Sequence, residues 1–309
     1  MTAPIRFSVQ ASVVNDPVAF RELASKAEDL GYSTISMADH VADGQLAPMI
    51  ALMAAADATT TLRVMSLVLG NDYRHPGLVA REAASVDLLS GGRLELGLGA
   101  GWMQADYDQL GVAYERPGTR IERLEEAVGI VDRLLRGETV HHVGEHYRID
   151  GLTGFPLPHQ QPRPPLLVAG GGRRILSVAA RTADIIGLNP GLGAGVIDHR
   201  AGPSATPDAT DQKLAWIRAA AGDRFDDLVF QTRIHMAAIS DDREQMAEVL
   251  APGLGVSPAD ALASPHALVG SVAQCVENVL EWRERWGISY IGLSADAIDD
   301  FAPVVAALS

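Results

Sequence analysis

The sequence predicts an α/β fold, specifically a (β/α)8 TIM barrel with insertions. Short apolar segments of strand length alternate along the chain with longer segments whose apolar residues recur at helical spacing. The early strand segments begin about thirty residues apart, as repeated right-handed βαβ units require. Eight such strands and a similar number of helices fit within 309 residues, as in a barrel of this class. A doubly wound parallel sheet is the alternative that this pattern leaves open.

The predicted strands and helices follow one another in regular order. The expected strands cover residues 6–11, 34–38, 62–69, 94–98, 166–169, 184–188, part of 227–239, and 288–293. The expected helices cover residues 17–30, 48–58, 76–89, about 120–135, a segment from 173, 271–286 and 301–308. The first helix carries clear boundary signals, because Asp16 can cap it, Pro17 occupies its first position and Gly31 follows its end.

Residues 1–309 are predicted to form one barrel domain with insertion segments near residues 100–118, 139–165 and 189–207. The second insertion holds many prolines and glycines and no helical period, and residues 146–149 could form a hairpin strand within it. The third is rich in glycine and proline, so we expect it to form a loop over the top of the barrel.

Composition bounds the class of protein. No stretch approaches the length of apolar residues that spans a membrane, and the N-terminus lacks a basic region followed by an apolar one. Cys275 is the single cysteine, which excludes an internal disulfide and fits a reducing compartment. A net charge of −14 argues against a nucleic-acid surface, although it leaves room for a local basic pocket. We therefore expect a cytoplasmic protein that binds neither membrane nor nucleic acid.

The most informative stretch is residues 166–176, where an apolar run leads through Gly170–Gly172 into a helix. Three glycines allow close approach of a ligand and positive φ angles, so the N–H groups of the turn and helix N-terminus can converge on an anion. Arg173 and Arg174 add cations where a phosphate would lie. A tight strand-to-helix turn with two solvated arginines explains the same residues, and both interpretations stay open.

A barrel carries its chemistry at the carboxyl ends of its strands. Asp39 and His40 follow the second strand. An imidazole there can exchange a proton near neutral pH, and the adjacent carboxylate can fix its tautomer or bind a ligand donor. The alternative is an aspartate that caps the next helix beside an exposed histidine. After the fourth strand, Gly99 and Ala100 would let the backbone approach a flat ligand, or they form a plain turn.

Three histidines, His141, His142 and His146, are candidates for metal ligands. They lie in the second insertion, away from the strand ends and without a carboxylate at ligand spacing. We expect a solvated hairpin here and predict no metal site.

Several motifs together carry a resemblance to a known family. They occupy residues 28–32, 39–40, 73–76, 90–102, 170–172 and 268–271. In this order and spacing, from Phe7 to Leu293, the chain resembles the luciferase-like, flavin- or deazaflavin-dependent oxidoreductases. Within that group it is most similar to the branch that uses coenzyme F420, a 5-deazaflavin.

The resemblance implies a barrel and a set of site residues. His40 would lie over the reactive face of the cofactor ring as the acid–base catalyst, and a non-proline cis peptide at Ser66–Leu67 would press on the back of the ring. The loop Gly170–Gly172 would hold the cofactor phosphate. The cofactor-binding residues implied are Asp39, Ser66, Leu67, Gly99, Ala100, Gly170, Gly171, Gly172 and Arg173. The family also implies a homodimer.

Two departures bear on the substrate. Sugar-phosphate dehydrogenases of the family carry a glutamate after the fourth-strand glycines, where this chain has Trp102. Arg200 and Arg233 are the only basic candidates near the strand ends or upper loop, so we expect a small, uncharged organic substrate.

The predicted function is therefore F420-dependent hydride transfer, with His40 as catalyst. Three alternatives stay open: an FMN-dependent monooxygenase on the same scaffold, a metal-dependent barrel hydrolase that uses Asp39, His40 and a third ligand, and a non-catalytic binder of a flavin-like ligand.

Overall fold

Parallel strands close into a ring in the part of the chain that the computed structural model describes, residues 4–11, 16–41, 44–192, 195 and 199–308. The strands of the ring are β1 (Arg6–Ala11), β2 (Thr34–Met37), β3 (Arg63–Ser66), β4 (Leu69–Gly70), β5 (Leu94–Gly99), β8 (Leu166–Gly170), β9 (Ile185–Leu188), β10 (Val229–Arg233) and β13 (Ile288–Ser294). Their order is β3-β2-β1-β13-β10-β9-β8-β5, with β4 continuing the position of β3 beside β5.

The ring is closed by pairing between β3 and β5. Val64 lies opposite Leu94, and Met65 lies opposite Glu95, in a parallel ladder. An open doubly wound sheet would leave these two strands as edges. The predicted (β/α)8 barrel is therefore confirmed, and the doubly wound alternative is wrong.

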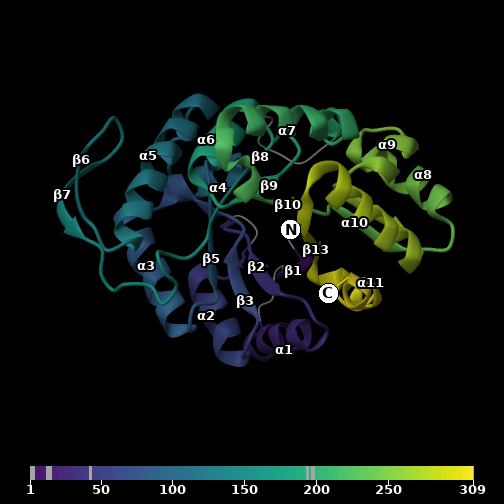
Figure 1. The fold of residues 1–309 in the computed structure, drawn as a ribbon, viewed down its shortest axis with the longest axis horizontal. Coiled ribbons are helices and arrows are strands. Elements are labelled where there is room, and N and C mark those ends of the chain that lie inside the picture. The colour runs from purple at the N-terminus through teal and green to yellow at the C-terminus, as the bar shows by residue number, and fades with distance from the viewer. Residues whose placement is uncertain (1–3, 12–15, 42–43, 193–194, 196–198, 309) are drawn as a thin grey trace.

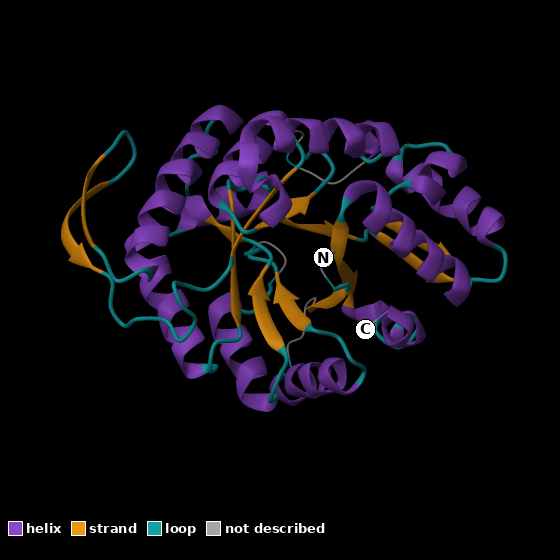
Figure 2. Cartoon of the chain, viewed as in Figure 1, coloured by secondary structure: helices purple, strands orange, loops and turns teal. Residues whose placement is uncertain are grey.

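Helices surround the barrel (Figures 1 and 2). They are α1 (Pro17–Asp29), α2 (Pro48–Ala58), α3 (Pro76–Leu89), α4 (Gln104–Leu110), α5 (Pro117–Leu135), α6 (Arg173–Thr182), α7 (Pro207–Ala221), α8 (Arg243–Leu254), α9 (Pro258–Ala263), α10 (Val272–Trp286) and α11 (Ala302–Leu308). Asp16 caps α1 as predicted, since its carboxylate accepts hydrogen bonds from the N–H groups of Val18 and Ala19. Among the described helices, none has the length and apolar character needed to cross a membrane.

The core lies inside the barrel and between the strands and helices. Strand residues such as Val9, Leu96 and Ile291 are fully buried, because helices cover the outer face of a parallel sheet. The predicted helix from residue 173 is confirmed as α6, and its buried face includes Ile175 and Leu176.

The insertions differ in structure. The first contains the short helix α4, and the second forms an antiparallel hairpin of β6 (Thr139–Val143) and β7 (Arg148–Thr153), which projects from the body in Figure 1. The predicted hairpin strand at 146–149 therefore begins two residues later and extends further. The third insertion contains a 3-10 segment, His199–Ser204, while its residues 193–194 and 196–198 lie outside the described residues.

The predicted third strand, residues 62–69, is divided into β3 and β4. The non-proline cis peptide lies between them at Leu67–Val68, so the expected position Ser66–Leu67 is wrong by one residue. Hydrogen bonding between this segment and β2 explains the difference, because it continues one residue beyond β3: the N–H of Leu67 donates to the Met37 carbonyl at 2.6 Å. Regular strand geometry therefore ends after Leu67.

The predicted strand within 227–239 is also divided. β10 belongs to the barrel, whereas β11 (Met236–Ile239) leaves it and pairs with β12 (Ala267–Gly270). Ser271 then begins α10 with a capping box, in which its hydroxyl and the Gln274 side chain satisfy each other's backbone N–H groups. The run 268–271 thus ends a small parallel pair outside the barrel and starts a helix.

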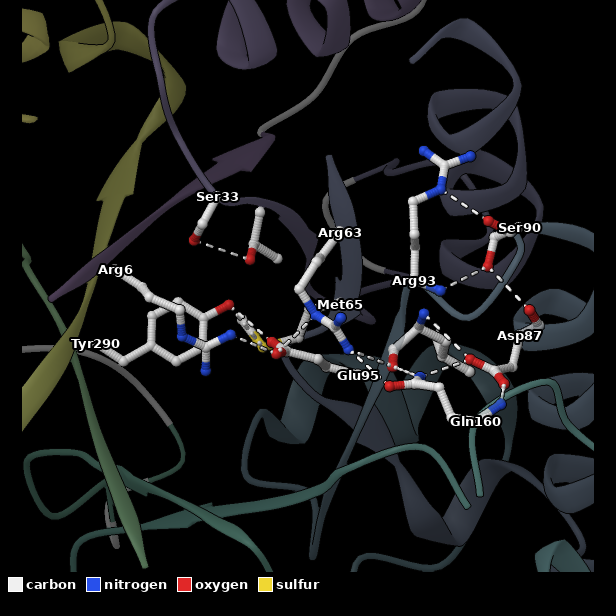
Figure 3. A network of polar contacts seen from close by, with 12 residues as sticks. Arg6, Ser33, Arg63, Met65, Asp87, Ser90, Arg93, Glu95, Gln160 and Tyr290 are labelled. Atoms are coloured by element: carbon white, nitrogen blue, oxygen red, sulfur yellow. Dashed lines mark hydrogen bonds and ion pairs between the residues drawn. The ribbon is translucent and has the colours of Figure 1, made fainter. Parts of the chain in front are cut away.

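A polar network lies at the amino ends of the strands, opposite the end where barrels carry chemistry (Figure 3). Glu95 is 1% exposed and accepts hydrogen bonds from Arg6 Nη1 at 2.7 Å and Arg63 Nε at 3.0 Å. The Tyr290 hydroxyl donates to the other carboxylate oxygen at 2.8 Å. This network joins β1, β3, β5 and β13 and is a structural element of the barrel floor.

Candidate functional site

A cavity of about 630 Å³ opens at the carboxyl ends of the strands. Most of the predicted site residues line it: Asp39, His40, Leu67, Gly99, Ala100, Gly170, Gly171 and Gly172. Two do not. Ser66 is fully buried beneath the wall, where its hydroxyl exchanges hydrogen bonds with the Gly97 N–H and carbonyl at 2.9 and 3.0 Å. Arg173 is exposed and does not line the cavity.

His40 is held by a carboxylate from another element. Its Nδ1 lies 2.8 Å from Oδ2 of Asp106, on α4. Asp106 is 1% exposed, and its other oxygen accepts the Val41 N–H at 2.8 Å. An ionised carboxylate can only accept a hydrogen bond, so this contact places the proton of neutral His40 on Nδ1. Nε2 is then unprotonated and is the ring atom that can take up a proton. The pair can orient an imidazole that exchanges protons within the cavity.

Asp39 has protein partners for both carboxylate oxygens. One accepts the Gly70 N–H at 2.9 Å and an Nη1 hydrogen bond from Arg74, and the other accepts from Arg74 Nη2 at 3.0 Å. The side chain is 8% exposed and lies on the cavity wall. Asp39 therefore links the end of β4, through Gly70, to Arg74 in addition to facing the cavity. It does not cap the next helix, whose N-cap is Ala47.

Trp102 forms the wall beside His40. The two rings meet edge to face, with centroids 5.3 Å apart. Trp102 brings an apolar surface and no titratable group to the position after the fourth-strand glycines. The carboxylate that contacts His40 comes four residues later, from Asp106.

The glycine turn packs closely at Gly170 and Gly171 and is open at Gly172. A Cβ atom on Gly170 would clash with the Ile175 side chain. A Cβ atom on Gly171 would lie 2.5 Å from the Pro190 carbonyl oxygen, whereas a Cβ on Gly172 would meet no atom within 4 Å. None of Gly170, Gly171 and Gly172 has a positive φ. The expected positive φ angles are therefore wrong, because the turn needs glycine at Gly171 for space.

The turn leads directly into the N-terminus of α6. Gly172 is the N-cap, and it offers no side chain that could accept hydrogen bonds from the first N–H groups of the helix. Gly170–Gly172 and Ile175 line the cavity, so this helix end faces it with its partial positive charge. Arg174 points to α5 and pairs with Glu122 at 2.5 Å, so neither predicted arginine contributes its charge to the wall.

The cationic side chain on this part of the wall is Arg120, in the first turn of α5. Arg120 is 4% exposed, lines the cavity and stacks on Tyr114, with its Cζ 4.0 Å from the ring centroid. Nε and Nη1 bond to no acceptor among the described residues. A buried guanidinium in this state favours an anionic ligand, because unpaired buried donors are costly.

Asp106 and Arg120 are the site residues that the sequence interpretation missed. Asp106 lies in a segment expected to be irregular, and its contact with His40 joins positions 66 residues apart. Arg120 did leave a signal. It lies on the buried face of α5 with Leu124 and Val128, at helical spacing, and a charge on an apolar helix face indicates a specific partner.

A second cation, the half-buried Arg233, lies at the end of β10. Its Nε donates to Gln10 Oε1 at 2.6 Å and its Nη2 donates to Ser294 Oγ at 2.5 Å, and these acceptors are neutral. Desolvation lowers the pKa of Arg233 to about 10. His235 also lines the cavity, beside Arg233.

The metal alternative has no set of ligands in the described part of the chain, where no three His, Cys, Asp or Glu side chains come together. Asp39 pairs with Arg74, and His40 contacts Asp106. The hairpin histidines contact separate carboxylates: His141 lies 3.0 Å from Asp150, and His142 lies 2.7 Å from Glu126.

Comparison with known proteins identifies two kinds of relative. The F420-dependent glucose-6-phosphate dehydrogenase of Nakamurella multipartita is 31% identical over 189 residues, which are 59% of this chain and 55% of that protein. The FMNH(2)-dependent dimethylsulfone monooxygenase of Pseudomonas putida is 28% identical over 198 residues, 61% of this chain and 54% of that protein. The chain thus spans about half the length of these curated relatives.

Solved structures share the fold. An F420-dependent secondary alcohol dehydrogenase in complex with an F420-acetone adduct superposes with a TM-score of 0.78 over 99% of this chain and 100% of that chain, at 16% identity. The sequence signature described as luciferase-like monooxygenase matches residues 1–201, which include His40, Asp106, Arg120 and the glycine turn. The chain belongs to the luciferase-like monooxygenase family.

Proposed function

We propose that this protein is a coenzyme F420-dependent oxidoreductase that transfers a hydride between the deazaflavin ring and a small organic molecule. The observation that carries the proposal is Arg120, a buried guanidinium whose Nε and Nη1 have no acceptor among the described residues, on the wall of the cavity that also contains His40. Such a cavity suits a ligand with an acidic group and a reacting ring. F420 has both, and the 31% identical relative is F420-dependent.

The residues present fit such a cofactor. The free N–H groups at the start of α6, the open space at Gly172 and the unpartnered donors of Arg120 suit its acidic group. Gly99 packs against the Val68 side chain, since a Cβ atom there would lie 2.5 Å from it, and both residues line the cavity, where we propose that they form part of the wall beside the ring. We propose that Asp39 and Leu67 complete this wall. Ser66 and Arg173 have no part in the proposed contact, because neither lines the cavity.

The protein's part in the reaction is to orient groups and to move a proton. When bound, the deazaflavin supplies or accepts the hydride. Asp106 fixes the tautomer of His40 and stabilises the imidazolium that forms when His40 takes up a proton. His40 would deliver the proton that accompanies hydride transfer to the substrate, and Trp102 would exclude water from its ring face.

An FMN-dependent monooxygenase is the second candidate, favoured by the FMNH(2)-dependent relative. FMN also carries a phosphate, so the glycine turn and Arg120 would serve it equally well. The two candidates differ in the ring that the cavity accepts and in whether the reduced protein reacts with oxygen.

Titration of the apo-protein with F420 and, separately, with FMN tests the proposal through the fluorescence of each compound. We expect micromolar or tighter affinity for F420 and much weaker affinity for FMN. The reverse order would replace the proposal by the monooxygenase candidate. Binding of neither compound would overturn both, and tight binding of F420 without turnover on any tested substrate would favour a non-catalytic binder.

A matched pair of variants tests the role of Arg120 in the same titration. Arg120→Met removes the buried guanidinium, and Arg116→Met removes an exposed one four residues earlier on the same helix. We expect Arg120→Met to weaken F420 affinity at least about tenfold, the usual size of a charge-assisted contact, and Arg116→Met to leave it nearly unchanged. Equal effects would remove Arg120 from the site.

The substrate, location and assembly are part of the proposal. We propose a cytoplasmic protein that acts on a small molecule. The expectation of an uncharged substrate stays a prediction, but its basis is weaker, because Arg233 lies on the cavity wall and its side-chain hydrogen bonds go to the neutral Gln10 and Ser294. Steady-state assays with paired neutral and acidic substrates of equal size would decide between the two.

We also propose a homodimer. Large apolar side chains are exposed on α2, on α3 and after the hairpin, namely Ile50, Leu78, Leu89 and Phe155, which are 57–79% exposed. Leu78 and Phe155 line one shallow pocket. Exposed apolar surface of this kind is typical of a subunit interface. Light scattering should give a mass of about twice 32.7 kDa, and a mass of 32.7 kDa would contradict the dimer.

A further inference from the structure

Lys213, on α7, is a buried cation outside the group of residues considered so far. Its side chain is 2% exposed. Its ammonium donates to the Asn189 carbonyl at 2.8 Å and to the Ser204 carbonyl at 2.6 Å. These two carbonyls are 15 residues apart along the chain, one at the start of the third insertion and one near its end. One side chain thus joins the start of that insertion, directly after β9, to its end.

The Asn189 end of this link supports the glycine turn. The N–H of Asn189 donates to the Gly170 carbonyl at 3.0 Å. The carbonyl oxygens of Asn189 and Pro190 pack so closely on Gly171 that a Cβ there would lie 2.6 and 2.5 Å from them. Asn189 and Pro190 also line the cavity. The carbonyl that Lys213 binds is therefore part of the surface on which the turn rests.

The charge of Lys213 is not matched by a carboxylate. No described acidic residue forms an ion pair with it, and burial alone lowers its pKa to about 8. The titratable groups that face it and its neighbours are His266, His235 and Arg233. His266 is fully buried, its Nε2 has no partner among the described residues, and burial keeps it neutral. Lys213 is thus a charged group among neutral and cationic ones, which an anion nearby would stabilise.

We propose that Lys213 is a positioning residue of the cofactor site: its ammonium holds the Asn189 carbonyl against the Gly170–Gly172 turn and adds positive charge behind the turn. This inference rests on the proposed function, because it assigns the turn to the acidic group of the cofactor. It predicts that binding of an anionic cofactor and protonation of Lys213 favour each other. A lysine that only stabilises the fold would show no such coupling.

The first test compares three variants by F420 titration and thermal unfolding. Lys213→Met should weaken F420 affinity at least about tenfold, as loss of a charged hydrogen-bonding group does. Lys213→Arg should recover part of the loss, because it keeps the charge. Lys26→Met is the control, since Lys26 is an exposed lysine paired with Asp299 on the surface. Unchanged F420 affinity in folded Lys213→Met would overturn the inference.

The second test uses the native protein and does not depend on the stability of a variant. The chain contains two lysines, Lys26 and Lys213, so a sample labelled with carbon-13 at lysine Cε gives two NMR signals. Lys26→Met assigns them. We expect the pKa of Lys213 to rise when F420 is added and that of Lys26 to stay constant. A Lys213 pKa that is equal with and without bound F420 would overturn the inference.

The same coupling appears in the pH profile of binding. F420 affinity of the native protein should fall as the pH rises above about 8, where Lys213 loses its proton, and should stay level over that range in Lys213→Met. A native protein that binds no F420 at any pH is a different result, because it would contradict the proposed function. A protein that binds F420 with a flat profile would contradict only the role of Lys213.

Discussion

His40 and Asp106 form the pair on which the proposed proton transfer depends. The 2.8 Å contact joins the end of β2 to α4, and it holds an imidazole whose surface opens to the cavity. A buried carboxylate beside a histidine orients the ring and fixes its tautomer. The chemistry therefore depends on two residues that play different parts.

Two substitutions separate these parts. His40→Ala removes the group that exchanges the proton, so kcat should fall by about 10²-fold or more. Asp106→Asn keeps the shape but lets the amide donate to Nδ1, which disfavours the required tautomer, so kcat should fall by about tenfold to a hundredfold. Both variants should bind F420 within a few-fold of the native protein. Turnover of His40→Ala close to that of the native protein would remove His40 from the catalytic role.

Arg120 and Asp106 show what a sequence pattern leaves out at the level of single residues. Asp39, His40 and the three glycines could be found because they follow predicted strands, where a barrel places its ligands. The partner of His40 could not be found in that way. Contacts between distant positions come from packing of elements, which periodicity does not record. Arg120 could have been found from its place on the apolar face of α5.

At the level of elements, the turn between β8 and α6 combines close packing with open space. Gly171 packs against the carbonyl oxygens of Asn189 and Pro190, whereas a Cβ atom on Gly172 would contact no other atom. The same three-residue sequence therefore meets two separate requirements. One concerns the stability of the barrel, and the other concerns the ligand.

Alanine substitutions distinguish the two requirements. Gly171→Ala places a methyl group 2.5 Å from a backbone oxygen, so it should reduce the free energy of unfolding by about 1–3 kcal/mol. Gly172→Ala meets no protein atom and should change it by less than about 0.5 kcal/mol, while weakening F420 affinity several-fold because the methyl group occupies ligand space. Urea unfolding and fluorescence titration measure both quantities. Loss of stability in Gly172→Ala, or equal F420 affinity, would contradict this account of the turn.

The polar network around Glu95 joins strands at their amino ends, on the side of the barrel opposite the glycine turn (Figure 3). Glu95→Gln leaves the Arg6 and Arg63 charges without their shared carboxylate, so the free energy of unfolding should fall by about 3 kcal/mol. Glu125→Gln is the control, because its ion pair with Arg181 is exposed and should contribute less than about 1 kcal/mol. The F420 affinity of folded Glu95→Gln should stay unchanged. A large loss of affinity would mean that the floor and cavity are coupled.

For the molecule as a whole, alternation of strand and helix patterns predicted a parallel sheet with eight strand positions, and that strand count favoured the barrel over the doubly wound sheet. Closure between β3 and β5 leaves no separate signal in the sequence, because it is a pairing of distant strands. The division of the third predicted strand could not be predicted from periodicity, because the apolar run continues through Val68. The seventh was predicted only as part of residues 227–239, and polar residues such as Arg233 and His235 within it do not show that Met236–Ile239 pairs elsewhere. Short apolar runs do not record where a strand leaves its sheet.

The charge of the whole molecule contrasts with that of the cavity wall. The chain carries a net charge of −14, yet Arg120, Arg233 and the N-terminus of α6 face the cavity. Asp39 and Asp106, the acidic residues on the wall, are engaged by Arg74 and His40. The positive potential is therefore local, as binding of one acidic ligand by an acidic protein requires.

A crystal structure of the protein soaked with F420 tests the central claim most directly. The account predicts that the acidic group of F420 contacts the turn Gly170–Gly172 and Arg120, and that its ring lies within reach of His40 in the same cavity. An F420 molecule bound elsewhere, or a cavity that stays empty in crystals soaked at saturating F420, would contradict it.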